Sequence, residues 1–174
     1  YHLHRRGFLH LDLKPANLLL RDGVPVLIDL DTARRVDSTR RPSRRLGTAP
    51  YMAPEQARRE PLSPAADVYG LGALLYELLT GRWAFEDVYA EPLEDGRPRQ
   101  FPQADSELPP RPGLYRDDLP PTLERTVMTC LASDPGDRFS SMHPLLLALV
   151  GELDAPVSLW PAGVRAERRQ HPRD

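Results

Sequence analysis

One stretch, residues 67–79, constrains the fold more than any other: Asp-Val-Tyr-Gly-Leu-Gly-Ala-Leu-Leu-Tyr-Glu-Leu-Leu. A helix made from it is apolar on almost every side, and such a helix is stable only when it is buried. Ser63 and Pro64 before it suit an N-cap and a first helical position. Gly70 and Gly72 each cost about 1 kcal/mol relative to Ala in a helix interior. They therefore indicate that another backbone approaches this helix closely.

Asp67 is an acid at the start of that apolar helix. Its carboxylate could cap the helix N-terminus, where negative charge is favourable. In a functional interpretation, it would also accept hydrogen bonds from the backbone of a functional loop elsewhere in the chain. Both interpretations stay open at this point.

The best candidate for such a loop is residues 10–20, His-Leu-Asp-Leu-Lys-Pro-Ala-Asn-Leu-Leu-Leu. Asp12 and Asn17 have the D-x-x-x-x-N spacing of a phosphotransferase catalytic loop. Lys14 lies between them and is the only lysine of the chain, while Asn17 is its only asparagine. An acid, a cation and an amide within one short loop indicate phosphoryl-transfer chemistry.

A β-hairpin is predicted directly after this loop. The leucines 18–20 read as a buried strand, Asp22-Gly23 as a tight turn and 24–28 as the returning strand. The hairpin would bring Asp29 back beside the loop, so that the carboxylates of Asp12 and Asp29 converge with the amide of Asn17. Hard oxygen ligands of this kind suit Mg²⁺.

Composition limits the classes of protein to consider. The chain has 174 residues, which is enough for one domain with a core. Its net charge of -2 predicts no global attraction to nucleic acid. The single cysteine, Cys130, excludes an internal disulfide and a cysteine-based zinc cluster, and we expect it to be buried. We find no apolar run long enough to span a membrane and no leader. We therefore expect a cytoplasmic protein.

The remaining segments are less regular. Residues 30–50 are polar, with six arginines and one acid between Arg34 and Arg45, and suit either a solvated loop or a regulated or substrate-facing segment. Residues 86–121 are rich in proline and predict an irregular excursion with at most one short helix. We predict helices over 123–132 and from Ser140 or Ser141 to about Leu153, followed by a Pro- and Arg-rich, disordered tail over 154–174.

Five motifs now fall into one order: HLDLKPAN, IDLD, GTAPYMAPE, DVYGLGALLYELLTG and CLASDPGDR. Their order and rough spacing resemble the C-terminal lobe of protein kinases over residues 1–153, and the GTAPYMAPEQ form is similar to bacterial relatives of the eukaryotic Ser/Thr kinases. The resemblance implies a mainly α fold with a small β-hairpin, the kinase-like C-lobe. The chain also opens inside a helical pattern at Tyr1, so we expect material upstream, including the N-terminal lobe, to be missing.

The resemblance implies ATP and Mg²⁺ (or Mn²⁺) as cofactors and a protein substrate. Asp12 would accept the hydroxyl proton or orient the attacking oxygen, and Lys14 would lie near the transferring γ-phosphate. Asn17 and Asp29 would hold the metal ion. Thr48 would contact Asp12 and Lys14 and help to receive the substrate residue.

Supporting roles follow from the same resemblance. Leu19 would form the floor of the adenine pocket. His10 would hold the catalytic loop and the Asp29 turn together. Glu55 would pair with Arg138 as a buried ion pair, and Asp67 would support the catalytic loop.

Three departures from the family pattern matter. Leu11 replaces the arginine that would bind a phosphorylated activation loop, so we expect no large gain in activity from phosphorylating Ser38, Thr39 or Ser43. Leu30-Asp31 replaces Phe-Gly: Leu30 would keep an apolar plug, whereas Asp31 lacks the freedom of glycine at positive φ. The sequence also has no Gly-rich phosphate loop and no second lysine, so it holds half of an ATP site.

Two other functions remain possible. A pseudokinase or interaction scaffold would explain the incomplete ATP site and Asp31, but it has no need of Asp12, Lys14, Asn17 and Asp29 together. A small-molecule phosphotransferase of the aminoglycoside- or choline-kinase type would explain the Asp29-Leu30-Asp31 turn. That class lacks the GTAPYMAPE motif and the helix that begins near Asp67.

Overall fold

The fold is mainly helical with two small antiparallel sheets. It was analysed as a computed structural model, which describes residues 1–37, 39–98, 100–105 and 108–153. The predicted tail, 154–174, lies outside the described residues. The α-helices are α1 (His2–Arg5), α2 (Pro54–Arg58), α3 (Pro64–Thr80), α4 (Glu86–Ala90), α5 (Pro102–Asp105), α6 (Pro121–Cys130) and α7 (Met142–Leu153). Short 3-10 turns lie at Pro15–Asn17, Ala49–Tyr51, Pro112–Leu114 and Pro135–Asp137.

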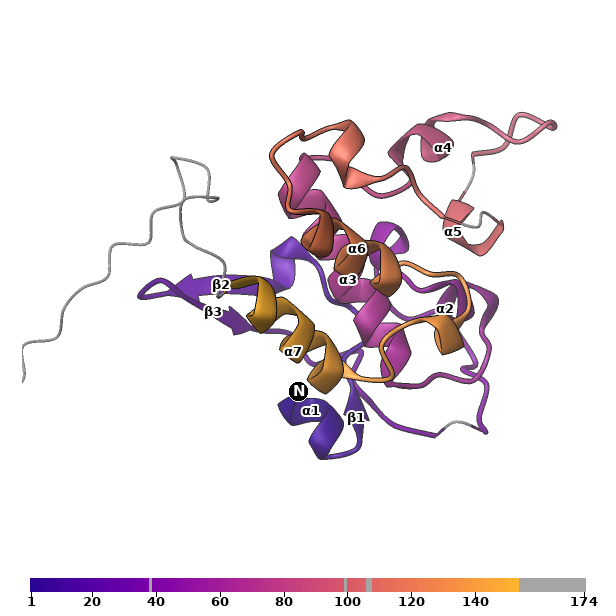
Figure 1. Cartoon of the computed structure of the whole chain (residues 1–174). Helices are drawn as coiled ribbons and strands as arrows, with labels where there is room; N and C mark the ends of the chain where they lie inside the picture. The colour runs from indigo at the N-terminus through magenta and orange to yellow at the C-terminus, as the bar shows by residue number, and fades with distance from the viewer. Residues whose placement is uncertain (38, 99, 106–107, 154–174) are drawn as a thin grey trace, which may run out of the picture.

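Helix α3 is the predicted buried helix and lies at the centre of the molecule (Figure 1). Ser63 is its N-cap, and the Ser63 side chain accepts a hydrogen bond from the backbone N–H of Ala65 at 3.3 Å. Tyr69 and Tyr76 on α3 are each only 1% exposed. Gly81 ends the helix in a left-handed conformation that glycine adopts without steric cost.

The predicted close approach to α3 occurs at Gly72. A Cβ atom built there would collide with the Cβ of Cys130 on α6, whereas one at Gly70 would meet Leu13 and Tyr51 at ordinary contact distances of 3.4 and 3.5 Å. Cys130 is fully buried, as predicted. Burial raises the pKa of its thiol to about 12, so the thiol is protonated at neutral pH.

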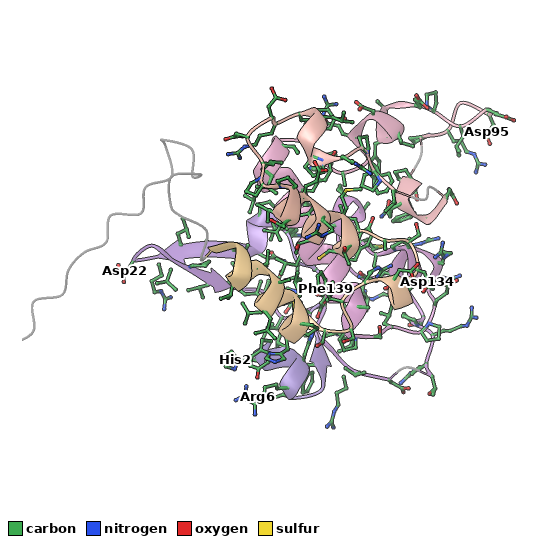
Figure 2. All side chains as sticks on the ribbon, viewed as in Figure 1. His2, Arg6, Asp22, Asp95, Asp134 and Phe139 are labelled. Carbon is green, nitrogen blue, oxygen red and sulfur yellow. The ribbon has the colours of Figure 1, made fainter. Side chains whose placement is uncertain are left out.

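The predicted hairpin is formed by β2 (Leu18–Arg21) and β3 (Val24–Leu27), with Leu18 opposite Leu27 and Arg21 opposite Val24. Asp22 at its tip is labelled in Figure 2. The prediction that the leucine strand is buried was wrong: Leu19 is 53% exposed and Leu20 is 77% exposed. The reason is that burial of a strand depends on what packs over it, and the hairpin extends from the side of the helical core (Figure 1).

A second sheet lies where only loop was predicted. Strand β1 (Phe8–Leu9) pairs antiparallel with β4 (Arg34–Arg35), and the Val36 N–H donates to the Gly7 carbonyl at 2.8 Å. These strands hold two residues each, too few for a period-two pattern to be visible in the sequence. Their pairing fixes the start of residues 34–45, which we call the arginine-rich segment, to the core.

The proline-rich region is more ordered than predicted. Its described part contains two short α-helices, α4 and α5, and a 3-10 turn at Pro112–Leu114, where at most one helix was expected. Prolines occupy the first positions of α5 and of the 3-10 turn, where the missing N–H costs nothing. Buried Gln103 then ties α5 to the carbonyls of Ala49 and Met52, both at 2.8 Å.

The last two helices lie close to their predicted positions. Helix α6 runs over Pro121–Cys130 against an expected 123–132, and α7 runs over Met142–Leu153. Val127 and Leu131 join Tyr69 and Tyr76 in the main core, while Cys130 and Leu145 pack with Val68 in a second cluster. The core thus surrounds α3. None of the helices in the described ranges combines the length and apolar character needed to cross a bilayer.

Candidate active site

The carboxylate of Asp12 lies at the centre of a compact polar network. The Thr48 hydroxyl donates to Oδ1 at 2.7 Å, Lys14 Nζ lies 3.0 Å from Oδ2, and Lys14 Nζ also donates to Thr48 Oγ1 at 2.8 Å. Burial acts to raise the pKa of Asp12, but the Thr48 and Lys14 hydrogen bonds, the Lys14 charge and the Asn17 hydrogen bond outweigh it. The pKa is therefore lowered, and Asp12 is an ionised acceptor at neutral pH.

Asn17 also contacts Asp12. Its side-chain nitrogen donates to the Asp12 backbone carbonyl at 2.8 Å and to Oδ2 at 3.2 Å. In the described part of the chain no hydrogen bond involves Asn17 Oδ1, so that oxygen remains available to a cation. Ile28 N–H donates to the Asn17 carbonyl at 2.9 Å, which brings the neighbouring Asp29 to this loop.

The residues present fit a magnesium ion shared with phosphate. Asp29 is exposed and lies in the left-handed region at φ 64°, with Oδ1 accepting from the Asp31 N–H at 3.1 Å. Across the described residues no three His, Cys, Asp or Glu side chains form a metal-binding group. One amide oxygen and one carboxylate are still sufficient donors for Mg²⁺, which commonly takes one or two carboxylates and completes its shell with phosphate and water.

Asp67 holds the backbone of the loop formed by residues 10–20. Its two oxygens accept from the N–H groups of His10 (2.8 Å) and Leu11 (2.7 Å), and His4 Nε2 lies 2.8 Å from Oδ2. Because Ser63 caps α3, the second of the two interpretations describes the contacts of Asp67. The contribution of His4 had no signal in the sequence, since His4 lies far from Asp67 along the chain.

His10 lies inside the site and is 1% exposed. Its Nδ1 accepts from the Asp12 N–H at 3.3 Å, while its Nε2 has no partner in the described structure. The link to the Asp29 turn is made by the His10 backbone, whose carbonyl accepts from the Thr32 hydroxyl at 2.7 Å. The imidazole thus supports the loop, and among the described residues it makes no hydrogen bond to the Asp29 turn.

Residues 46–56 contact the loop formed by residues 10–20 at two points. Gly47 lies at φ 111°, and a Cβ there would collide with the Leu11 carbonyl oxygen. Gln56 is buried and donates from Nε2 to the carbonyls of Leu11 (3.0 Å) and Leu46 (2.9 Å). Sequence reasoning missed Gln56, although an amide that follows Glu55 in the GTAPYMAPEQ motif was a usable signal.

Glu55 and Arg138 form a buried two-bond ion pair. Arg138 donates to the two Glu55 oxygens at 2.8 and 2.9 Å, and their side chains are 3% and 0% exposed. Arg138 also donates to the Ala65 carbonyl at 3.0 Å and lies 4.9 Å from the centre of the Tyr69 ring. Arg138 thus connects α2, through Glu55, to α3, through the Ala65 carbonyl.

The departures from the family pattern have specific conformations. Leu11 is buried in the main core and adopts φ 68°. Leu30 is 55% exposed, so it does not form the expected apolar plug within the described structure. The left-handed residue of this turn is Asp29 rather than Asp31, so replacing glycine at position 31 imposes no strain in this conformation. Leu19 lies exposed on β2, where a ligand could cover it.

The sequence matches the protein kinase domain family over residues 1–147. The chain therefore belongs to the protein kinase domain family. This assignment separates it from the small-molecule phosphotransferases considered above.

Curated relatives are bacterial serine/threonine-protein kinases. PknL of Mycobacterium tuberculosis is 35% identical over 91% of this chain and 40% of its own length. PkaA of Streptomyces coelicolor is 40% identical over 79% of the chain and 24% of its own length. A probable serine/threonine-protein kinase of Corynebacterium efficiens is 36% identical over 79% of the chain and 21% of its own length. The chain thus spans well under half the length of these relatives.

Proposed function

We propose that this chain is the catalytic-loop half, or C-terminal lobe, of a serine/threonine protein kinase that transfers the ATP γ-phosphate to protein hydroxyl groups. The observation that carries the proposal is the network in which Asp12 accepts from Thr48 and faces Lys14 and Asn17. A pseudokinase scaffold has no need to hold an ionised carboxylate beside a partly exposed lysine.

In this mechanism Asp12 orients the substrate hydroxyl and takes its proton as the phosphoryl group transfers. Thr48 holds Asp12 in place and lies where the substrate residue must approach. Lys14 is close enough to Asp12 to contact a phosphoryl group transferred at that point. Asn17 Oδ1 and the Asp29 carboxylate would hold Mg²⁺, which neutralises phosphate charge when bound.

Residues other than Asp12, Lys14, Asn17 and Asp29 would have to bind the α- and β-phosphates of ATP. The sequence has one lysine, already committed beside Asp12, and no glycine-rich loop. We propose that polypeptide outside this sequence supplies a phosphate-binding lysine and a glycine-rich loop. The same polypeptide would cover Leu19 on the exposed face of the hairpin. On this view residues 1–153 form one lobe, and the 174 residues alone do not transfer phosphate.

A transfer assay with γ-labelled ATP and Mg²⁺ tests the proposal. The gene product that contains this sequence should label protein at Ser and Thr, identified by mass spectrometry, and Asp12→Asn should abolish labelling without loss of the folded structure. Mg²⁺-dependent nucleotide binding with no labelling of any protein would instead assign a pseudokinase. Labelling of an aminoglycoside or choline in place of protein would also overturn the proposal.

A further inference from the structure

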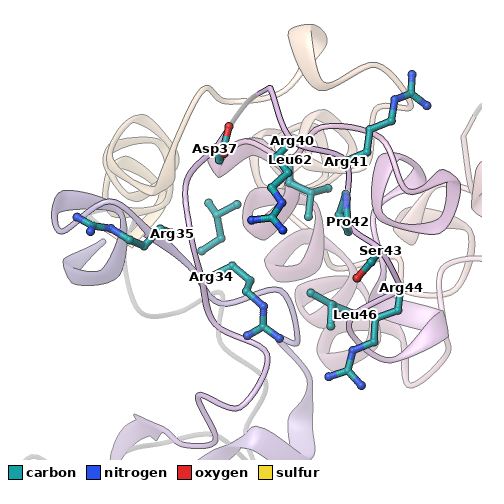
Figure 3. Close-up of a pocket in the computed structure, with 11 residues that line it drawn as sticks. Arg34, Arg35, Asp37, Arg40, Arg41, Pro42, Ser43, Arg44, Leu46 and Leu62 are labelled. Atoms are coloured by element: carbon teal, nitrogen blue, oxygen red, sulfur yellow. The ribbon is translucent and has the colours of Figure 1, made fainter.

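A cavity of about 370 Å³ lies between the arginine-rich segment and the core (Figure 3). Its floor is apolar and is made by Leu9, Leu46 and Leu62. Five arginines and a single acid, Asp37, also line the cavity; the arginines are Arg34, Arg35, Arg40, Arg41 and Arg44. We call this site the arginine pocket.

The arginines of this pocket lie close together along the chain. Some arginines elsewhere pair with acids, as Arg82 does with Glu86 and Arg116 with Asp118. Among the described residues, Arg40, Arg41 and Arg44 form no ion pair. Asp37 accepts hydrogen bonds from the backbone and hydroxyl of Thr39, which holds its charge within the loop. The pocket therefore carries a net positive charge that an anion would neutralise.

The pocket is also close to the proposed site of phosphoryl transfer. Leu46 in its floor precedes Thr48 by two residues, so their Cα atoms lie within about 7 Å of each other. Thr48 in turn donates to Asp12. An extended peptide advances about 3.3 Å per residue. An acidic side chain about two to four residues from the acceptor hydroxyl would therefore reach the pocket.

We infer that the arginine pocket binds acidic side chains of the polypeptide substrate and selects acceptor sites with glutamate nearby. Glutamate fits because its methylene groups can contact the leucine floor while its carboxylate meets the arginine rim. The role in substrate selection rests on the proposed kinase function. Peptide binding requires neither ATP nor turnover, so this inference and the proposed kinase function can be tested separately.

The test measures fluorescence anisotropy of labelled peptides bound to the 174-residue chain. One peptide has a serine flanked by glutamates at two to four residues, and a matched peptide has glutamines there. We expect the glutamate peptide to bind about tenfold more tightly at low salt, since each exposed ion pair contributes roughly two- to fivefold. Raising the salt concentration should remove most of this preference.

Variants assign the preference to the pocket. The triple change Arg40→Gln, Arg41→Gln and Arg44→Gln should bring the two peptides to within about twofold of each other. The control Arg6→Gln, Arg111→Gln and Arg125→Gln removes the same charge from exposed sites elsewhere and should keep the preference. Adding an anion with Ser43→Asp should weaken binding of the glutamate peptide, whereas Ser140→Asp should not. Far-UV circular dichroism checks that each variant is folded.

Several outcomes would overturn the inference. Equal affinity for the two peptides, or an unchanged preference in the pocket triple variant, would do so. So would a single-stranded oligonucleotide that binds more tightly than the glutamate peptide and displaces it. Glutamate-selective binding without phosphate transfer by the longer gene product would contradict only the proposed function. Phosphate transfer without a preference for acidic peptides would contradict only this inference.

Discussion

At the scale of single residues, the site depends on the ionised carboxylate of Asp12. This carboxylate accepts a hydrogen bond from Thr48 and lies beside the positive charge of Lys14. Hydrogen bonds from Thr48 and Lys14, together with the Lys14 charge, lower the pKa of Asp12 below its ordinary 3.8 despite burial. A lowered pKa means that Asp12 contributes to stability above the unfolded-state pKa. That contribution is lost as the pH falls through the folded-state pKa.

We therefore predict that Asp12 stays ionised from pH 8 down to pH 5. In Lys14→Met and Thr48→Val its pKa should rise, because each change removes a group that favours the charged form. Titration of the ¹³C-labelled carboxyl by NMR measures this directly. A wild-type midpoint above 3.8 would contradict the network as described, and Arg21→Met, which removes a cation on the distant hairpin, should leave the midpoint unchanged.

A second prediction concerns Asp67, whose two oxygens accept from two consecutive backbone N–H groups. Asp67→Asn leaves one acceptor and turns an NH₂ group toward a buried N–H donor. The expected loss is roughly 1–3 kcal/mol in the free energy of unfolding, measured by urea denaturation. Asp118→Asn removes an acid from an exposed pair with Arg116 and should change stability by less than about 0.5 kcal/mol.

At the scale of elements, prediction from sequence succeeded where the signal is local. The apolar run and the Ser63-Pro64 start were sufficient for α3, and Asp22-Gly23 was sufficient for the hairpin turn. It failed where the outcome depends on distant residues. The two-residue strand β1 needs β4 to exist, and the exposure of Leu20 depends on what covers the hairpin. Gln56 acts on Leu11, which is distant along the chain.

The crossing of α3 and α6 gives a prediction at this scale. A Cβ at Gly72 would collide with Cys130, whereas one at Gly70 has room. Gly72→Ala should cost about 1–3 kcal/mol of stability through overpacking, while Gly70→Ala should be neutral or stabilise by up to about 1 kcal/mol through helix propensity. Thermal unfolding of the two variants compares them. Similar effects of the two changes would show that the helices do not approach as closely as described.

At the scale of the whole molecule, Arg138 joins parts that are far apart in sequence. It bonds Glu55 on α2, the Ala65 carbonyl on α3, and the carbonyls of Ala132 and Ser133 after α6. Its loss would leave the Glu55 charge buried without a partner. The ion pair is therefore a structural link for the domain, and it could be anticipated from sequence only through the family resemblance.

We predict that Arg138→Ala lowers the free energy of unfolding by about 3–5 kcal/mol, the cost of breaking one partner of a buried pair. Arg138→Lys should recover only part of this loss, because an ammonium group cannot reproduce the two-bond geometry. Arg97→Ala, which breaks the exposed pair with Asp95, is the control and should cost less than about 1 kcal/mol. Equal losses at Arg138 and Arg97 would argue against a buried pair.

The segment that carries the arginines, residues 34–45, is held at its start by the β1–β4 pairing and is followed by Gly47 and Gln56, which contact Leu11. Contacts outside this loop therefore offset the conformational entropy cost of closing it. Doubling the length of such a loop costs only about 0.6 kcal/mol. Residues 36–45 could therefore be lengthened, shortened or given another charge by mutation with little penalty to the fold. Related chains could therefore differ in the polypeptides they bind while keeping the same loop at residues 10–20.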